Sequence, residues 1–148
     1  QKMKGVAMLT SSHTWLVGME IFERHGFTEV ASAPPSFQLM VNRFGSAPEP
    51  DLPSDWDART KALGRGLTVI RTPQCPYIEN ATTAILAVAE ARGIKSKVIE
   101  LKSAKEVRER SPFAYGIFGS VLDGKPLAYQ YLLEKDFDKL LQERNYGG

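Results

Sequence analysis

The first apolar stretch of the chain predicts a strand, and the residues after it predict a helix. Residues 5–10, Gly-Val-Ala-Met-Leu-Thr, form an apolar run of strand length. Apolar side chains then recur at helical spacing from Trp15 to Phe22, and a glycine at Gly26-Phe27 is a typical helix end. We therefore expect a helix that begins near Trp15 and ends at His25.

Two strands are predicted next. Residues 28–31 and 37–44 are rich in apolar and β-branched side chains, and Ala-Pro-Pro-Ser at 33–36 separates them. Two sets of side chains alternate along the second run: Phe37, Leu39 and Val41, and Gln38, Met40 and Asn42. This alternation is typical of a half-buried antiparallel strand.

Residues 46–65 predict a connector between two domains. This stretch contains Pro48, Pro50 and Pro53 and has few consecutive apolar residues, as expected of a segment that crosses a protein surface. Its acidic residues are expected to be solvated, since no histidine or rigid element would hold them around a metal. The predicted domains are therefore residues 1–45 and residues 66–148.

Seven further elements are predicted after the connector. The pattern predicts strand, helix, strand, helix, strand, strand and helix at 67–71, 76–92, 96–101, 103–110, 115–122, 125–130 and 134–144. Asp123-Gly124 is a strong hairpin signal between the last two strands. Strands joined by helices come first and an antiparallel pair closes the sheet, so this part is expected to be an α/β domain.

The single cysteine of the chain lies where the first of these strands becomes a helix. Thr72-Pro73 ends the strand, because proline lacks an amide donor and disfavours helix in the residue before it. Pro76 suits a first helical turn. Cys75 is therefore expected at a helix N-terminus, where free amides and the positive dipole end favour a thiolate. The alternative is a small packing residue without chemistry.

Composition and charge exclude several classes of function. A net charge of +2, without a basic run that contains aromatic residues, does not predict nucleic-acid binding. The apolar runs are shorter than the roughly 20 residues of a membrane span, and the N-terminus lacks a signal-peptide pattern, so we expect a cytoplasmic protein without a membrane partner. One cysteine with His13 and His25 gives no zinc pattern, so no metal is expected. Both histidines are expected to be solvated or capping residues rather than acid–base catalysts.

The sequence Cys75-Pro76-Tyr77-Ile78 resembles the Cys-Pro-Tyr-Cys active site of glutaredoxins, and the β-α-β-α-β-β-α order resembles the minimal thioredoxin fold. The resemblance implies a thiol groove in which Cys75 faces Pro112, at the place of the family's cis-proline, with Tyr77 and Tyr115 nearby. Isoleucine replaces the second cysteine, so a redox cycle would need an external thiol such as glutathione. A lysine that glutaredoxins often carry is Thr72 here, so glutathione binding does not follow from the motif.

The strand-helix-strand-strand pattern of residues 4–44 resembles the C-terminal half of the GNAT acetyltransferase fold. The most specific part is an aromatic residue, Phe22, four places before Gly26-Phe27. The family's pyrophosphate loop for acetyl-CoA is absent, and Phe22 stands where a tyrosine often protonates the leaving thiolate. The segment is therefore expected to be part of a longer protein, with a second chain or copy completing the half-domain and pairing with its open sheet edge.

The two resemblances together match bacterial GNAT proteins that carry a YoaP-like C-terminal domain. This arrangement implies a parent N-acetyltransferase that uses acetyl-CoA and acetylates a small-molecule or peptide amine. Three hypotheses remain open for the chain. It is part of such a transferase, or a monothiol redox module that uses Cys75, or a module that only binds a ligand beside Cys75.

Overall fold

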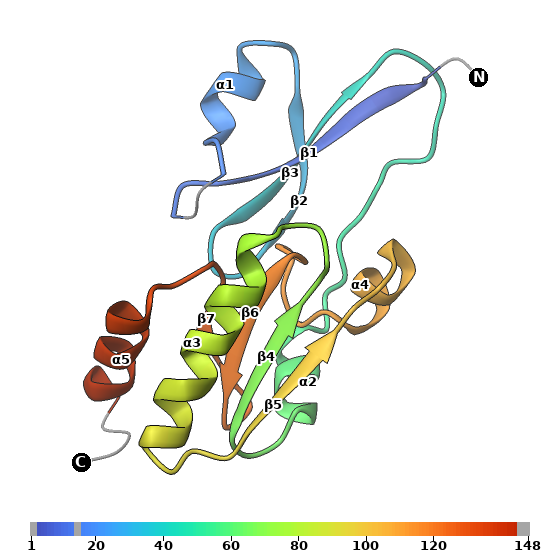
Figure 1. The fold of residues 1–148 in the computed structure, drawn as a ribbon. Coiled ribbons are helices and arrows are strands. Elements are labelled where there is room, and N and C mark those ends of the chain that lie inside the picture. The colour runs from blue at the N-terminus through green and yellow to red at the C-terminus, as the bar shows by residue number, and fades with distance from the viewer. Residues whose placement is uncertain (1–2, 14–15, 145–148) are drawn as a thin grey trace. The chain divides into compact units, whose positions relative to one another are not determined.

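In the computed structural model the described residues are 3–13 and 16–144, and they form two compact units (Figure 1). The division between the units falls between Ser54 and Asp55. Each unit has its own sheet. The mixed α/β composition expected from the sequence is therefore confirmed.

The N-terminal unit is an antiparallel sheet with one short helix. It consists of β1 (Gly5–Ser11), α1 (Met19–Glu23), β2 (Thr28–Ala33) and β3 (Phe37–Arg43). The strand order is β1-β3-β2, so the last strand in sequence is the central one. The predicted order of strand, helix, strand and strand is confirmed.

Two details of this unit differ from the sequence prediction. The helix α1 begins at Met19, not near residue 15, and Trp15 lies outside the described residues. The alternation along β3 predicted that only one face of the strand is buried. This is wrong at Met40, which is 0% exposed although it lies on the opposite face from Phe37, which is also 0% exposed. The central strand has neighbours on both sides, so its side chains are more covered than those of an edge strand.

The C-terminal unit has the predicted order of elements, preceded by one more helix. Its elements are α2 (Trp56–Ala62), β4 (Leu67–Arg71), α3 (Tyr77–Ala91), β5 (Ser96–Glu100), α4 (Ala104–Arg110), β6 (Phe118–Leu122), β7 (Lys125–Ala128) and α5 (Glu134–Glu143). The sheet order is β5-β4-β6-β7, with β4 and β5 parallel and the other neighbours antiparallel.

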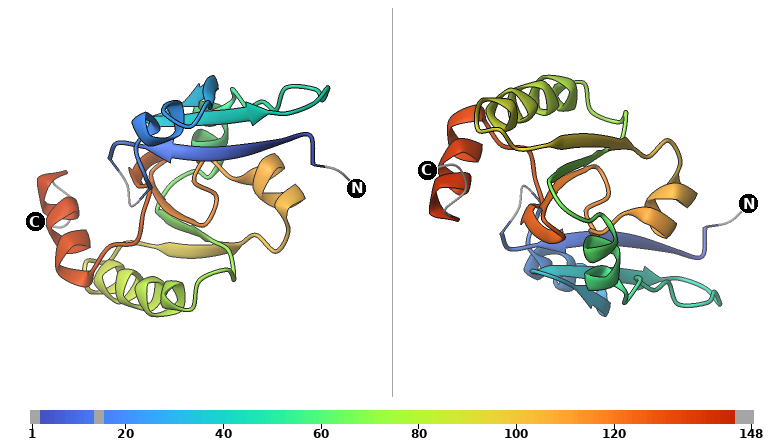
Figure 2. Two further views of the ribbon diagram at one scale, coloured as in Figure 1. Left: turned by 90° about the horizontal axis from the view of Figure 1, so that it is seen from above. Right: turned by 90° about the horizontal axis from the view of Figure 1, so that it is seen from below.

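Helices cover both faces of this sheet (Figure 2). On one face α3 and α5 pack through Ile85, Phe137 and Leu141, which are fully buried with Leu67 and Val69 of β4. A second apolar cluster on the other face consists of Ile70, Leu101, Phe113 and Val121, with Leu63 and Val107 packed against it. Successive residues of β4 therefore contribute to both apolar clusters: Leu67 and Val69 to the first and Ile70 to the second. This packing on both faces holds β4, the strand that leads to Cys75, in place.

The boundaries in the C-terminal unit agree with the predictions to within two residues, with two exceptions. The strand expected at 115–122 begins at Phe118, because residues 112–117 form bends and a turn. The expected connector 46–65 contains α2, and residues 44–55 before this helix and 63–66 after it lack helix or strand. The predicted Asp123-Gly124 hairpin turn is confirmed, with φ of 48° and 72°, and Asp123 Oδ1 also accepts a hydrogen bond from Gly66 N at 2.7 Å.

Within the described ranges, no helix has the length and apolar character needed to cross a bilayer.

Candidate functional site

The turn between β4 and α3 places Cys75 at the start of the longest helix in the described chain. Thr72 is buried, and its amide donates to Ile117 O of the neighbouring segment at 2.9 Å. Pro76 is the N-cap of α3, and Ile78 N donates to Cys75 O at 3.2 Å. Cys75 is half-buried and packs against the core beneath α3. The predicted strand-to-helix position of Cys75 is confirmed.

A small cavity opens beside this turn. Its volume is about 210 Å³. The turn and the helix supply its apolar wall and the thiol, and the end of the sheet supplies charged groups. The lining residues are Arg71, Thr72, Pro73, Cys75, Pro76, Ile78, Glu79 and Glu100.

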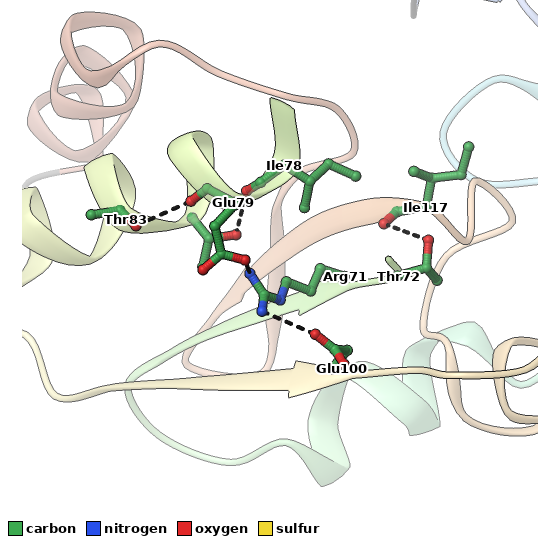
Figure 3. Close-up of polar contacts among 8 residues, drawn as sticks. Arg71, Thr72, Ile78, Glu79, Thr83, Glu100 and Ile117 are labelled. Carbon is green, nitrogen blue, oxygen red and sulfur yellow. Dashed lines mark hydrogen bonds and ion pairs between the residues drawn. The ribbon is translucent and has the colours of Figure 1, made fainter. Parts of the chain in front are cut away.

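An arginine between two carboxylates forms the charged side of this cavity (Figure 3). Arg71 Nη2 donates to Glu100 Oε2 at 2.9 Å, and Arg71 Nη1 donates to Glu79 Oε2. Arg71 ends β4 and is the register partner of Glu100 in β5, while Glu79 lies in the first turn of α3. Burial alone would lower the pKa of Arg71, but its hydrogen bonds to Glu79 and Glu100 and their charges raise it.

This charge distribution bears on the redox hypothesis. Reactive cysteines lie in electropositive surroundings, and glutathione carries carboxylates that need cationic partners. The cavity beside Cys75 is lined by one guanidinium and two carboxylates, so it has an excess of negative charge. The side chains around this cysteine therefore do not favour a glutathione-linked redox cycle.

The predicted partners of Cys75 do not line this cavity. Tyr77 points away from the core and is 70% exposed. Tyr115 is half-buried, and its pKa is raised first by burial and second by the charge of Cys75. Pro112 is buried at the α4–β6 loop. The groove made of Cys75, Pro112, Tyr77 and Tyr115 stays a prediction.

The cis-proline implied by the resemblance is not found at Pro112. The cis peptide bond in the described part of the chain is Pro34-Pro35, in the N-terminal unit. Ser111 has an extended backbone with ψ of 132°, as expected before a proline, and Arg59 Nη1 donates to its carbonyl at 3.0 Å. Ser111 Oγ also donates to Phe113 O at 2.8 Å, so the loop is held on both sides of the proline.

The sequence interpretation missed Arg71, Glu79 and Glu100 as a group. A local signal existed, because Arg71 and Glu100 both end strands that were predicted to be parallel neighbours. Parallel strands of equal register bring their carboxyl ends together, so opposite charges at these two positions indicate a contact. Glu79 could not be assigned to this group from the sequence, because its position beside Arg71 depends on the three-dimensional course of the turn between β4 and α3.

A larger hollow lies between α3 and α5, with a volume of about 630 Å³. Apolar side chains form much of its surface, and Arg92 Nη2 pairs with Asp138 Oδ1 at 2.7 Å at its edge. Its lining residues are Ala87, Val88, Ala91, Arg92, Leu133, Glu134, Lys135 and Asp138. Two cations and two carboxylates balance one another there, so this hollow shows no preference for a charged ligand.

The histidines of the N-terminal unit are exposed and have local partners. His13 Nδ1 lies 2.7 Å from Ser12 Oγ, and His25 Nδ1 lies 2.7 Å from Ile21 O. Phe22 packs edge-to-face on Phe27, with ring centroids 5.3 Å apart. The spacing between Phe22 and Gly26-Phe27 is therefore explained by the packing of the two phenylalanine rings. Among the described residues, no three His, Cys, Asp or Glu side chains are grouped so that they could hold a metal ion.

One comparison with known proteins identifies a relative. The chain is 30% identical over 129 residues to a Bacillus subtilis (strain 168) protein described as uncharacterized N-acetyltransferase YoaP, an alignment that covers 86% of this chain. The alignment covers 50% of the relative, so the chain matches about half the length of that protein. No protein-family description matches the chain, and no solved structure matches it. The aligned stretch is longer than either compact unit, so it includes parts of both.

Proposed function

We propose that this chain is part of an acetyl-CoA-dependent N-acetyltransferase in which a GNAT-like segment is joined to a thioredoxin-like accessory domain. The observation that carries the proposal is the 30% identity over 129 residues to a protein named as an N-acetyltransferase. The alignment includes parts of both units, so the similarity to this relative is not confined to one of them.

The topology of each unit supports this proposal. The order β1-β3-β2, with α1 between the first two strands in sequence, is compatible with the C-terminal half of a GNAT fold. The order β5-β4-β6-β7, with one parallel and two antiparallel pairs, is compatible with a thioredoxin-like domain. The likeness in each case is one of strand order and direction, and it rests on analogy at the level of the fold.

The described residues do not form an acetyl-CoA site by themselves. A pyrophosphate is generally held by the backbone amides of a glycine-rich loop at the start of a helix. The N-terminal unit has only the five-residue α1, with Gly18 as its N-cap and no such loop before it in the described residues. Phe22 has no proton to donate to a leaving thiolate, and it is packed on Phe27. The remaining parts of the site are therefore proposed to come from the half that the relative has in addition.

A hybrid protein tests the proposal. The matched half of the Bacillus subtilis protein is replaced by this chain, and acetyl-CoA binding is measured by calorimetry for the hybrid and for the intact relative. We expect the hybrid to bind within about tenfold of the intact relative, a difference of about 1.4 kcal/mol. A hybrid that is folded by circular dichroism but does not bind acetyl-CoA, when the relative does, would refute the proposal.

For the C-terminal unit we propose ligand binding rather than redox chemistry. The excess of carboxylates around Cys75 supports this choice. In the same hybrid, Cys75→Ser is expected to leave acetyl-CoA binding within about twofold. A redox role predicts instead that the wild-type hybrid exchanges thiol and disulfide with glutathione and that Cys75→Ser abolishes this exchange. The Thr83→Ser variant, which changes an exposed hydroxyl on α3, is the matched control.

A further inference from the structure

The strand β1 forms an open edge of the N-terminal sheet. In the described structure its backbone is hydrogen-bonded to β3 alone, in the order β1-β3-β2. Phe44 N donates to Lys4 O at 3.0 Å, directly beyond the terminal pair of the ladder, which is Gly5 and Arg43. Hydrogen-bonded and non-hydrogen-bonded pairs alternate along an antiparallel ladder, so the N–H and C=O of Gly5 point away from β3.

The same alternation identifies the other backbone groups on this edge. Ala7 and Leu9 follow Gly5 at every second position, so their N–H and C=O groups also point outward. Ala7 is exposed, and Gly5 and Leu9 are half-buried. Thr10 and Ser11 are buried, so the accessible part of the edge ends at Leu9.

The sequence of β1 lacks the features by which an edge strand avoids pairing. Residues 5–11, Gly-Val-Ala-Met-Leu-Thr-Ser, contain neither a charged side chain nor a proline, and Met8 is 41% exposed. The other outer strand of this sheet, β2, carries Glu29 and has a register shift between Glu29 and Ala31. A regular apolar edge is a template for a further strand, whereas a charge and a bulge disrupt that template. Of the two edges, β1 is therefore the one suited to adding a strand.

A second copy of β1 fits this edge. In an antiparallel pair centred on Ala7, this residue lies opposite the same residue of the other copy, and Gly5 lies opposite Leu9. Each of these pairs joins outward-pointing groups and can exchange two hydrogen bonds, as an isologous contact about a twofold axis requires. The charged residue nearest in sequence, Lys4, falls opposite Thr10, so no like charges meet across the pair.

Side chains on one face of the strand support the same register. Val6 lies opposite Met8 of the other copy, and the twofold axis repeats this apolar contact. Cross-strand pairs of this kind stabilise a sheet, and the contact would cover the exposed part of Met8. The pairing also joins two three-stranded sheets into one continuous sheet of ordinary width.

We propose that this chain forms a dimer in which the β1 strands of two copies pair antiparallel about Ala7. The contact is short, and small interfaces are typical of weak, transient association. We therefore expect a dissociation constant of roughly 0.1 mM. The proposal rests on the N-terminal unit and does not depend on the acetyltransferase function proposed above.

Sedimentation and NMR of the 148-residue chain test the dimer and its location. Sedimentation from about 10 µM to about 1 mM spans the expected dissociation constant. Over the same range, the amides of Gly5, Ala7 and Leu9 are expected to become protected from hydrogen exchange as the concentration rises. In a mixture of isotope-labelled and unlabelled chains, NOEs between Val6 and Met8 of different copies would identify the register.

Variants at the centre of the pair separate this contact from any other. Ala7→Lys places like charges opposite each other and is expected to weaken the dimer at least about tenfold. Ala7→Pro removes an outward amide that makes no bond to β3, so it should weaken the dimer without breaking the ladder. Ser32→Lys adds the same charge at an exposed position of β2 and should leave the dissociation constant within about twofold. Circular dichroism checks that each variant is folded.

Four results would overturn the proposal. The chain could stay monomeric at about 1 mM. A dimer that neither variant of Ala7 weakens would use another surface. Protection of the Ala7 amide in a monomer at about 10 µM would mean that another part of the chain covers the edge. Protection seen only in the hybrid with the Bacillus subtilis protein would assign the edge to that protein's other half. None of these results decides whether the hybrid binds acetyl-CoA, so the two proposals fail separately.

Discussion

Two glycines at the start of β4 offer a matched test of how the C-terminal sheet is built. Gly64 and Gly66 both have positive φ, at 75° and 86°. A Cβ added to Gly64 meets nothing within 4 Å, whereas a Cβ added to Gly66 would lie 2.4 Å from Lys95 O. That oxygen accepts the hydrogen bond of Leu67 N at 2.9 Å, beside the first pair of the β4–β5 ladder. Substitution by alanine therefore tests backbone strain alone at Gly64, and backbone strain together with a steric clash at Gly66.

The expected magnitudes follow from these contacts. A left-handed conformation costs a residue with a side chain about 1–2 kcal/mol, and this is the whole effect expected for Gly64→Ala. In Gly66→Ala the Cβ and Lys95 O must separate by a further 0.6 Å to reach even 3.0 Å, and both partners are fixed by the sheet. Overpacking of this kind adds about 1–3 kcal/mol, so we expect a total of about 2–5 kcal/mol for Gly66→Ala.

Urea unfolding followed by fluorescence measures both free energies. Trp56 lies in α2 of the C-terminal unit, and Trp15→Phe as the common background leaves Trp56 as the reporter. Gly66→Ala is expected to lower the free energy of unfolding by at least about 1 kcal/mol more than Gly64→Ala, with an unchanged urea dependence. Equal losses in the two variants would show that Lys95 yields freely, and the assignment of Gly66 to a close backbone contact would be wrong.

Three further predictions concern the core and the site. Leu141→Ala is expected to cost about 2–5 kcal/mol in urea unfolding, because Leu141 is 0% exposed, whereas Lys139→Ala on the exposed face of α5 should stay within about 0.5 kcal/mol. Arg71→Gln should destabilise the chain by about 1–3 kcal/mol in urea unfolding, since two carboxylates lose their common partner. An unchanged free energy of unfolding would contradict this cause. Burial and the charge of Cys75 raise the pKa of Tyr115 in the folded chain above its usual value of about 10. The stability that the neutral phenol contributes is therefore complete below about pH 10 and is lost as the pH rises through the folded-state pKa. In alkaline unfolding, Tyr115→Phe should consequently lose less stability than the wild type between about pH 9 and pH 11.

The order of elements could be predicted because its signals are local. Proline, glycine and apolar spacing around residues 66–93 determine where β4 ends and α3 begins and ends, and these features act within a few residues. The Asp123-Gly124 hairpin is similar, since both residues adopt the positive φ that such a turn requires. The position of Cys75 followed from these signals.

The helix α2 could not be predicted from its own residues, because contacts with a distant segment support it. Arg59 Nη1 donates to Arg108 O at 2.8 Å and to Ser111 O at 3.0 Å, across about fifty positions of sequence. Arg59 also lies over the Trp56 ring, 5.5 Å from its centroid. The proline-rich surroundings hid this helix, since most helical stability in proteins comes from packing and not from propensity.

The cavity beside Cys75 was missed for a related reason. Its charges come from the ends of two strands and the first turn of a helix, and only the β4–β5 register places Arg71 opposite Glu100. The sequence interpretation gave the partners of Cys75 from a family motif instead, as Pro112, Tyr77 and Tyr115. Of these three, Tyr115 has a pKa that the charge of Cys75 raises, after burial as the larger cause.

The outer strands of the C-terminal sheet have a consequence for how the protein behaves at high concentration. At one edge, β5 carries Lys97, whose Nζ donates to Leu63 O at 2.9 Å, and at the other, the four-residue β7 contains Pro126 beside an irregular register. Lysine, proline and short, irregular strands are the features by which native sheets resist pairing with other chains. Neutralising Lys97, by acetylation or by Lys97→Leu, would remove one of these safeguards next to the exposed Val98 and favour precipitation through edge-to-edge pairing.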